Sequence, residues 1–327
     1  MKILLATYPM AHQTPGGGEV QIFYYKKYLS KLGYKVSYFD QWKDKINKFD
    51  LVHFFSCVGG SQHFCKYVKD IGLPLVISPN LWINNKNKIN YNLNEIKNIL
   101  SLSDKIICNS KIELKYLTKI FNLNKKSFDY VYNGVDKNFF QPINENIFRK
   151  KYKINYPFIL NVANIEKRKN QLKLVEVCNK LNKKLIIIGH IRDKKYCDLI
   201  NRMDKKKILK IIPSIDHNSI YLRSAYKACK YFVLPSILET PGLSSLEAAA
   251  QGKNLLITEE GSCREYYEKK VLYCNNSNLE KKLEELFTKP AINLNVTKHV
   301  KKFEWSKSIL RLDRVYKDLI KWKKVLV

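Results

Sequence analysis

The sequence predicts an α/β protein made of two doubly wound halves. Short apolar runs alternate with longer amphipathic segments, a pattern typical of parallel sheets flanked by helices. The alternation breaks in the polar stretch 141–156 and then begins again, which indicates two sheets. A chain of 327 residues is long enough for two domains that each bury a core. We therefore expect a first domain over residues 1–150 and a second over 151–309.

Six strands are expected in each half. In the first half they cover 2–7, 35–39, 50–55, 74–78, 105–109 and 128–132, and in the second 157–163, 184–189, 208–213, 230–234, 253–257 and 271–274. Helical periodicity predicts helices over 19–32, 61–71 and 110–121. From Phe303 to the end, apolar side chains such as Ile309, Leu312 and Tyr316 recur at helical spacing. We expect a long amphipathic helix there, which needs an apolar surface to cover.

The net charge of +30 is carried almost entirely by lysine, since only eight of the 59 basic residues are arginine. Such a bias fits an A/T-rich coding sequence that places lysine on solvated faces. It also fits attraction to an anionic membrane surface or a lipid-phosphate acceptor. Nucleic-acid recognition is disfavoured, because bidentate contacts to phosphates and bases favour arginine.

The chain is expected to be cytoplasmic. No apolar run approaches the roughly 18 residues needed to cross a bilayer. The opening Met1–Thr7 is too short for a signal peptide and is interpreted as a buried strand. The eight cysteines occur singly, without a C-x-x-C pair, as expected for reduced and mostly buried thiols rather than a metal site or disulfide framework.

The first candidate phosphate-binding loop is Thr14-Pro15-Gly16-Gly17-Gly18-Glu19, which follows the first strand and precedes a helix. Consecutive glycines let the backbone approach a ligand closely. Their N–H groups and the helix start form an anion-binding concavity. The alternative is a flexible turn, because the loop matches neither G-x-G-x-x-G nor a P-loop.

The second candidate runs from Glu239 to Glu247. A small-residue helix begins near Gly242, so the N–H groups of Gly242, Leu243 and Ser244 are available to a diphosphate. Glu247 lies about one turn into this helix, where it can reach a ribose diol, and Glu239 would face the sugar. The alternative is a helix-capping residue and a solvated charge.

The third candidate is the basic loop Asn164-Ile-Glu-Lys-Arg168-Lys169-Asn170-Gln171, at the carboxyl end of an expected strand. A cation there can neutralise a leaving diphosphate. Taken alone, a basic loop is usually just solvated.

Together these motifs resemble retaining glycosyltransferase family 4, also called the group 1 glycosyltransferases. The resemblance covers nearly the whole chain and rests on the E-x7-E segment 239–247, the loop 16–19 and Lys169-Asn170-Gln171, with support from 132–136, 261–265 and 303–305. It implies the GT-B fold, in which two Rossmann-like domains face each other across a cleft. It also implies that the last helix, about 310–327, crosses back to the first domain.

The resemblance implies an NDP-sugar donor bound by the second domain and an acceptor bound by the first. Lys169 would bind the diphosphate, Glu247 the ribose and Glu239 the transferred sugar, which makes Lys169 and Glu239 the catalytic candidates. Gly17 and Gly18 would approach the phosphates on domain closure. No metal or other cofactor is expected, because no D-x-D motif stands near these loops.

Two positions depart from the family pattern. Asn164 stands where the family usually has an arginine, and the neighbouring Arg168 is the substitute cation. Asn80 stands near the position of a usual histidine, where its amide can bind a sugar hydroxyl without acid–base work. Asn80 and Glu19 are assigned to the acceptor or sugar side.

The expected function is retaining transfer of a sugar to a glycan, lipid-linked or other hydroxyl acceptor, in surface polysaccharide or glycolipid synthesis. One alternative is a sugar-nucleotide epimerase of the same architecture. Another is a non-catalytic basic protein that binds membrane or nucleic acid and has a degenerate donor site.

A membrane-facing surface is expected to carry lysines and tyrosines of the segments 19–32 and 61–71, namely Lys26, Lys27, Lys31, Lys66, Lys69, Tyr24, Tyr25 and Tyr28. Core packing is the expected fate of most of these tyrosines.

Overall fold

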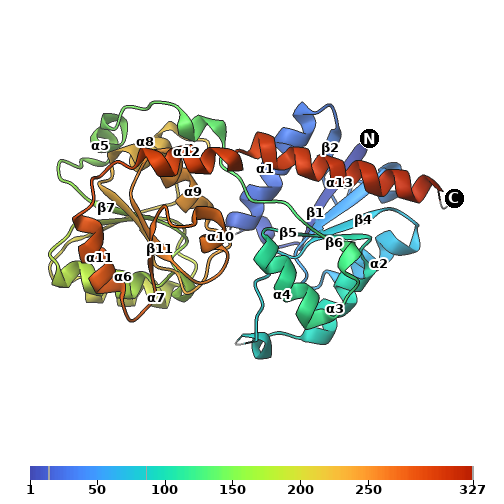
Figure 1. Cartoon of the computed structure of the whole chain (residues 1–327), viewed down its shortest axis with the longest axis horizontal. Coiled ribbons are helices and arrows are strands. Elements are labelled where there is room, and N and C mark those ends of the chain that lie inside the picture. The colour runs from blue at the N-terminus through green and yellow to red at the C-terminus, as the bar shows by residue number, and fades with distance from the viewer. Residues whose placement is uncertain (14, 86, 326–327) are drawn as a thin grey trace. The chain divides into compact units, whose positions relative to one another are not determined.

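The computed structural model describes residues 1–13, 15–85 and 87–325, so Thr14 of the glycine loop and the last two residues lie outside the described part. The chain divides into two compact units (Figure 1). Unit 1 comprises Met1–Asn133 and Trp305–Val327, and unit 2 comprises Gly134–Glu304. Each unit contains a six-stranded sheet in which all the paired strands are parallel.

The sheet of unit 1 has the strand order β2-β1-β3-β4-β5-β6. Its strands are β1 (Lys2–Thr7), β2 (Lys35–Tyr38), β3 (Leu51–Phe55), β4 (Leu75–Ser78), β5 (Lys105–Cys108) and β6 (Phe128–Tyr130), and its helices include α1 (Gly17–Lys31), α2 (Gln62–Asp70), α3 (Leu93–Leu102) and α4 (Lys111–Phe121). The order reverses between β1 and β3. In doubly wound sheets such a switch point is where ligands bind, beyond the carboxyl ends of the strands.

The long C-terminal helix α13 (Trp305–Val325) packs on α1 of unit 1, as expected from its amphipathic pattern. The indole of Trp305 is 1% exposed and stacks on Tyr24, with ring centroids 5.3 Å apart. Further along the helix, Tyr316 Oη shares a hydrogen bond of 2.5 Å with Nδ1 of the buried His53. The other ring nitrogen of His53 lies 2.8 Å from Ser78 Oγ. The helix is therefore fixed by aromatic stacking at its start and by a buried polar chain further on.

The sheet of unit 2 has the order β12-β11-β10-β7-β8-β9, with its switch point between β7 and β10. Its strands are β7 (Ile159–Val162), β8 (Leu185–Ile188), β9 (Leu209–Ile212), β10 (Tyr231–Leu234), β11 (Leu255–Thr258) and β12 (Leu272–Cys274). Its helices include α5 (Asn146–Tyr152), α6 (Gln171–Lys180), α7 (Lys194–Met203), α8 (Ile220–Ala228), α9 (Leu243–Ala250), α10 (Cys263–Tyr267), α11 (Leu279–Phe287) and α12 (Leu294–Val300). The predicted α/β class with two doubly wound domains is confirmed.

Unit 2 begins at Gly134, earlier than the boundary expected at residue 150. The polar stretch contains α5, which packs on α8 of unit 2. The backbone N–H of the buried Phe148 donates to Ser224 Oγ at 2.9 Å, and the Arg149 guanidinium donates to the carbonyl of Ala228 at 2.8 Å. The polarity of this stretch reflects its solvated face, whereas one buried aromatic side chain ties it to unit 2.

All eight cysteines are buried and none forms a disulfide, as expected for reduced thiols. Within the described residues, no helix combines the length and the apolar character that a membrane span requires.

The buried His53 makes the stability of unit 1 depend on pH. Burial lowers the pKa of His53 to about 3. Because the unfolded histidine binds a proton near pH ~6.5 and the folded one does not, the free energy of unfolding should fall as the pH drops from ~6.5 toward ~3, at up to about 1.4 kcal/mol per pH unit. Urea unfolding of wild type and His53→Gln between pH ~7 and ~4 measures this slope.

The His53→Gln variant should lose most of that slope. His63→Gln, which removes an exposed histidine of the same unit, should keep it. Equal slopes in wild type and His53→Gln would contradict a neutral, buried His53.

Candidate functional site

The candidate site in unit 2 lies at the switch point of its sheet. Strands β7 and β10 are neighbours, with Tyr231 paired to Ile159. The loop 164–171 follows β7, and the loop 235–242 follows β10. Two of the three loops expected to bind phosphate therefore leave adjacent strands at their carboxyl ends, where open α/β sheets hold ligands.

A buried ion pair joins these two loops. Lys169 Nζ lies 2.5 Å from Glu239 Oε1, and their side chains are only 13% and 6% exposed. Ser236 Oγ donates a hydrogen bond of 2.6 Å to the same carboxylate oxygen. Burial alone would raise the pKa of Glu239, but the charges of Lys169 and Arg168 outweigh it and the pKa lies below its usual range. The structure thus holds an ionised carboxylate and an ammonium group at the switch point.

Arg168 and Asn170 connect the loops further. The backbone N–H of Ile237 donates to the carbonyl of Arg168 at 2.8 Å, and Arg168 Nη1 donates to the carbonyl of Leu238 at 3.3 Å. Asn170, in the left-handed region with φ 56°, donates from Nδ2 to the carbonyl of Pro235 at 3.1 Å. The Arg168 side chain is half exposed and pairs with Glu166, so its charge remains accessible beside the site.

Asn164 lies at the start of the same loop, after β7. Its carbonyl accepts a hydrogen bond of 2.9 Å from Nε2 of the buried Gln171. The backbone of Asn164 thus helps to hold the loop, a role that does not depend on the side chain at this position.

The start of α9 touches the same carboxylate. Gly242 has φ 81°, and a Cβ placed on it would lie 3.2 Å from Glu239 Oε2 and 2.8 Å from Cδ2 of Leu234. Glycine is therefore required both by the backbone conformation and by the close approach. The N–H groups of Leu243 and Ser244 open the first turn of α9, where helical partners are lacking. The start of α9 therefore lies beside Oε2 of Glu239, and Lys169 pairs with Oε1 of the same carboxylate.

A third segment, 260–262, forms hydrogen bonds with the backbone of Glu239. The backbone N–H of Ser262 donates to the carbonyl of Glu239 at 3.0 Å, and the N–H of Glu239 donates to the carbonyl of Glu260 at 3.3 Å. Between them Gly261 has φ 99°, and a Cβ there would lie 2.0 Å from the carbonyl oxygen of Glu239. The 261–265 motif therefore positions the loop that carries Glu239.

Glu247, expected to reach a ribose, belongs to a buried polar network of unit 2. It is 3% exposed; Tyr226 Oη donates to its Oε2 at 2.5 Å, and His217 Nε2 lies 3.2 Å from its Oε1. Burial raises the pKa of Glu247, which His217 and Tyr226 only partly offset. The ring of Phe139 lies against both partners. His217 and Tyr226 are not predicted from the sequence, because neither belongs to a motif and both are more than 20 residues from Glu247.

In unit 1, α1 begins at Gly17, within the predicted glycine loop. Glu19 Oε2 accepts a hydrogen bond of 2.6 Å from the N–H of Gly16. The carboxylate of Glu19, assigned to the acceptor or sugar side, is therefore used to cap its own helix.

Gly18 and Asn80 lie together at the carboxyl edge of the sheet in unit 1. A Cβ on Gly18 would lie 3.3 Å from Asn80 Nδ2. Asn80 Oδ1 accepts a hydrogen bond from Asn109 Nδ2 at 3.2 Å, and Asn109 Oδ1 accepts one from Gln21 Nε2 at 2.8 Å. This chain of amides includes Gln21 and Asn109, which are not predicted from the sequence because single amide residues carry no motif.

On the surface of segments 19–32 and 61–71, which was expected to face a membrane, two lysines are paired with carboxylates and the tyrosines are buried. Lys66 pairs with Asp70 and Lys69 with Asp104, each at 2.7 Å. The three tyrosines Tyr24, Tyr25 and Tyr28 are at most 5% exposed, so they pack in the core, as expected for most of them. This face therefore offers fewer unpaired charges and less exposed aromatic surface than the sequence indicates.

Two doubly wound units, each with a six-stranded parallel sheet, identify the fold as the GT-B glycosyltransferase fold. Residues 143–303, which make up most of unit 2, match the family model described as "Glycosyl transferases group 1".

Curated relatives are similar to part of this chain, and solved structures share its fold. A glycogen synthase of Clostridium beijerinckii is 25% identical over 159 residues, covering 41% of this chain and 33% of the relative, so the chain spans about a third of the length of that relative. Sucrose-phosphate synthase from Thermosynechococcus elongatus has a similar fold, with a TM-score of 0.83 at 17% identity over 98% of this chain and 99% of that chain. Anabaena Alr3699/HepE in complex with UDP-glucose has a TM-score of 0.77 at 15% identity, over 97% of this chain and 100% of that chain.

Removing one partner of the buried ion pair should destabilise unit 2. Lys169→Met leaves the ionised Glu239 buried without its cation, so we expect the free energy of unfolding to fall by about 3 kcal/mol. The double variant Lys169→Met/Glu239→Gln should recover much of that loss. Chemical denaturation of the single and double variants measures the coupling.

Lys173→Met is the matched control, because Lys173 forms an exposed pair with Glu176 at 2.7 Å. Its cost should stay below about 1 kcal/mol. A cost for Lys169→Met no larger than that for Lys173→Met would contradict a buried, ionised pair.

Proposed function

We propose that the protein is a retaining glycosyltransferase that moves a sugar from an NDP-sugar to a hydroxyl group of a glycan, lipid-linked or other acceptor. The observation that carries this proposal is the Lys169–Glu239 ion pair beside the start of α9, at the switch point of a group 1 glycosyltransferase domain. The UDP-glucose complex of Alr3699/HepE, a protein of the same fold, supports an NDP-sugar as the class of donor.

The donor diphosphate would be bound by the positive groups of this site. Lys169 supplies an ammonium group, Arg168 an accessible guanidinium, and Leu243 and Ser244 the N–H groups of a helix start. These groups are already in place before charge develops on the leaving phosphate, and a single such donor typically lowers a barrier by about 3–4 kcal/mol. Because these cations serve the leaving group, we propose that the reaction needs no divalent metal.

Glu239 has two tasks in this proposal. It orients the ammonium of Lys169 while the site is empty, and its carboxylate accepts hydrogen bonds from hydroxyls of the transferred sugar once the diphosphate engages Lys169. Glu247 lies deeper and orients His217, whose side chain is 22% exposed, toward the donor ribose. Glu247 is therefore a positioning residue, and His217 is a ribose-contacting residue that adds to the predicted set.

In the transfer step the bond between the anomeric carbon and the diphosphate oxygen breaks, and a bond to the acceptor oxygen forms on the same face of the sugar. The acceptor hydroxyl passes its proton to the leaving phosphate oxygen, so no side-chain base is required. The amide chain of Asn80, Asn109 and Gln21 in unit 1 suits hydrogen bonding to sugar hydroxyls. We propose an acceptor of surface polysaccharide or glycolipid synthesis, with an anionic membrane surface as a further partner.

Donor binding is tested first by thermal shift with UDP-, GDP- and dTDP-sugars. A matching donor stabilises the protein by RT ln(1 + [L]/Kd), so even a modest binder raises Tm measurably. Lys169→Met should abolish the shift, whereas Lys173→Met should preserve it. No shift with any NDP-sugar would contradict a donor site.

Turnover is tested by NDP release with and without a hydroxyl acceptor, in buffer containing EDTA. Release should require the acceptor, and Lys169→Met should lower kcat by about 100-fold or more. An inverted anomeric configuration of the product, determined by NMR, would refute retention. Conversion of the NDP-sugar without an acceptor would identify an epimerase, and donor binding without any turnover would identify a non-catalytic protein.

A further inference from the structure

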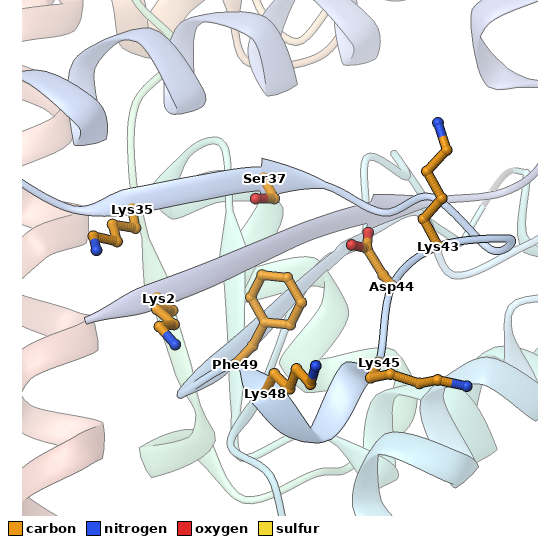
Figure 2. A pocket seen from close by; sticks show the side chains of 8 residues that line it. All are labelled: Lys2, Lys35, Ser37, Lys43, Asp44, Lys45, Lys48 and Phe49. Atoms are coloured by element: carbon orange, nitrogen blue, oxygen red, sulfur yellow. The ribbon is translucent and has the colours of Figure 1, made fainter.

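A basic hollow of about 380 Å³ lies at the outer edge of the sheet in unit 1, beside the edge strand β2. Five lysines line it: Lys2, Lys35, Lys43, Lys45 and Lys48. Figure 2 shows their side chains around the ring of Phe49. Lys2 and Lys35 are paired in register at the first residues of β1 and of the edge strand β2, and the others come from the loop that leads to β3. The hollow therefore runs along the outer edge of the sheet, from the amino ends of β1 and β2 to the loop that follows β2.

Among the described residues that line the hollow, five are lysines and one, Asp44, carries a carboxylate. Lys43 lies 3.5 Å from Asp40, whereas the other four lysines have no carboxylate within salt-bridge distance. Asp44 lines the hollow, but its Oδ2 accepts a hydrogen bond of 2.7 Å from the N–H of Asp40. Asp50 likewise accepts one of 2.6 Å from the N–H of Lys2. Asp44 and Asp50 keep their negative charge in these hydrogen bonds, but the five lysines outnumber the carboxylates beside them, so the hollow remains net positive.

An exposed tryptophan adjoins the hollow. Trp42 immediately precedes Lys43 and is 87% exposed. Its backbone N–H donates to Asp40 Oδ1 at 3.0 Å, which fixes the turn that presents the indole. Indole rings favour the interface between water and lipid headgroups, and long lysine side chains reach from apolar surroundings to phosphates.

We propose that the lysine hollow binds phosphate-bearing headgroups of an anionic lipid surface and that Trp42 inserts into the interface beside it. Two observations favour lipid over nucleic acid. All five cations are lysines, which act as point charges and cannot make the bidentate base contacts of arginine. Beside the hollow, Trp42 is 87% exposed, whereas single-stranded nucleic acid is bound by several exposed rings stacked along a groove. This inference does not rest on glycosyl transfer, since the donor site lies in unit 2.

The charge requirement is tested with the full-length protein by co-sedimentation with vesicles of phosphatidylcholine alone or in equimolar mixture with phosphatidylglycerol. Wild type should bind the mixed vesicles, and binding should weaken as salt rises. Lys45→Glu/Lys48→Glu should weaken binding by about 30-fold or more, because each lysine near an anionic surface contributes about a factor of five.

The matched control is Lys205→Glu/Lys206→Glu, which changes the net charge equally through exposed lysines of unit 2. Its effect on vesicle binding should be far smaller. Equal losses in the two variants would overturn the proposal, because binding would then follow net charge alone. Thermal shift with the NDP-sugar should be unchanged in both variants, which separates failure of this proposal from failure of the donor site.

The role of Trp42 is tested with Trp42→Ala, which should weaken vesicle binding by about tenfold. Ile89→Ala is its control, since Ile89 is 88% exposed in the same unit. Blue-shifted tryptophan fluorescence on vesicle addition, lost in Trp42→Ala, would support insertion. An unchanged affinity of Trp42→Ala would overturn insertion of the indole.

The source of the phosphate is tested by competition at constant ionic strength. Inorganic phosphate and pyrophosphate should leave vesicle binding intact, because they lack the interface that Trp42 enters. Displacement by either would assign the hollow to a soluble phosphate and overturn the lipid assignment. Tighter binding to single-stranded DNA than to anionic vesicles, lost in Lys45→Glu/Lys48→Glu, would overturn it in favour of nucleic acid.

Discussion

The buried ion pair between Lys169 and Glu239 is the constraint on which the site of unit 2 depends. Taking two charges out of water costs several kcal/mol per ion, and attraction compensates only when the geometry is good and other polar atoms assist. Here Ser236 donates to the carboxylate, and Arg168 adds a second positive charge. The three segments that carry or clasp Glu239 are consequently joined by backbone hydrogen bonds, and glycine is required at positions 242 and 261. A costly pair of this kind gives a preorganised electrostatic site.

The fold was predictable from the sequence because its signal is regular. Each expected strand is present with ends within two residues of the prediction, since fully buried parallel strands are continuous apolar runs bounded by polar turns. The unit boundary was less predictable. The segment 141–156 reads as a linker by composition, yet the burial of Phe148 against α8 makes it part of unit 2. Composition reports the average polarity of a segment, whereas packing depends on single side chains.

The candidate site was predictable only where a motif carries it. Lys169, Glu239 and Gly242 lie in two motifs that follow adjacent strands, so the switch-point rule brings them together. His217 and Tyr226 reach Glu247 from segments without any motif, and their contact depends on how α8 and α9 pack. Glu19 is the opposite case, because it lies inside a motif but its carboxylate caps the amino end of its own helix. Sequence proximity to a motif therefore indicates location more reliably than role.

The two sheets carry different chemistry at their carboxyl ends, and this difference gives the departure at Asn80 a physical meaning. Unit 2 presents charged groups, with Lys169 and Arg168 near a helix start. Unit 1 presents neutral amides, because Asn80 is bonded to Asn109, which in turn is bonded to Gln21. A histidine at position 80 would introduce a group that titrates near neutral pH into this amide chain. Amides keep both donor and acceptor capacity at any physiological pH, which suits binding of uncharged hydroxyls but supplies no acid or base. If the acceptor proton leaves with the phosphate, the chemistry requires charge at the switch point of unit 2 and only hydrogen bonding in unit 1.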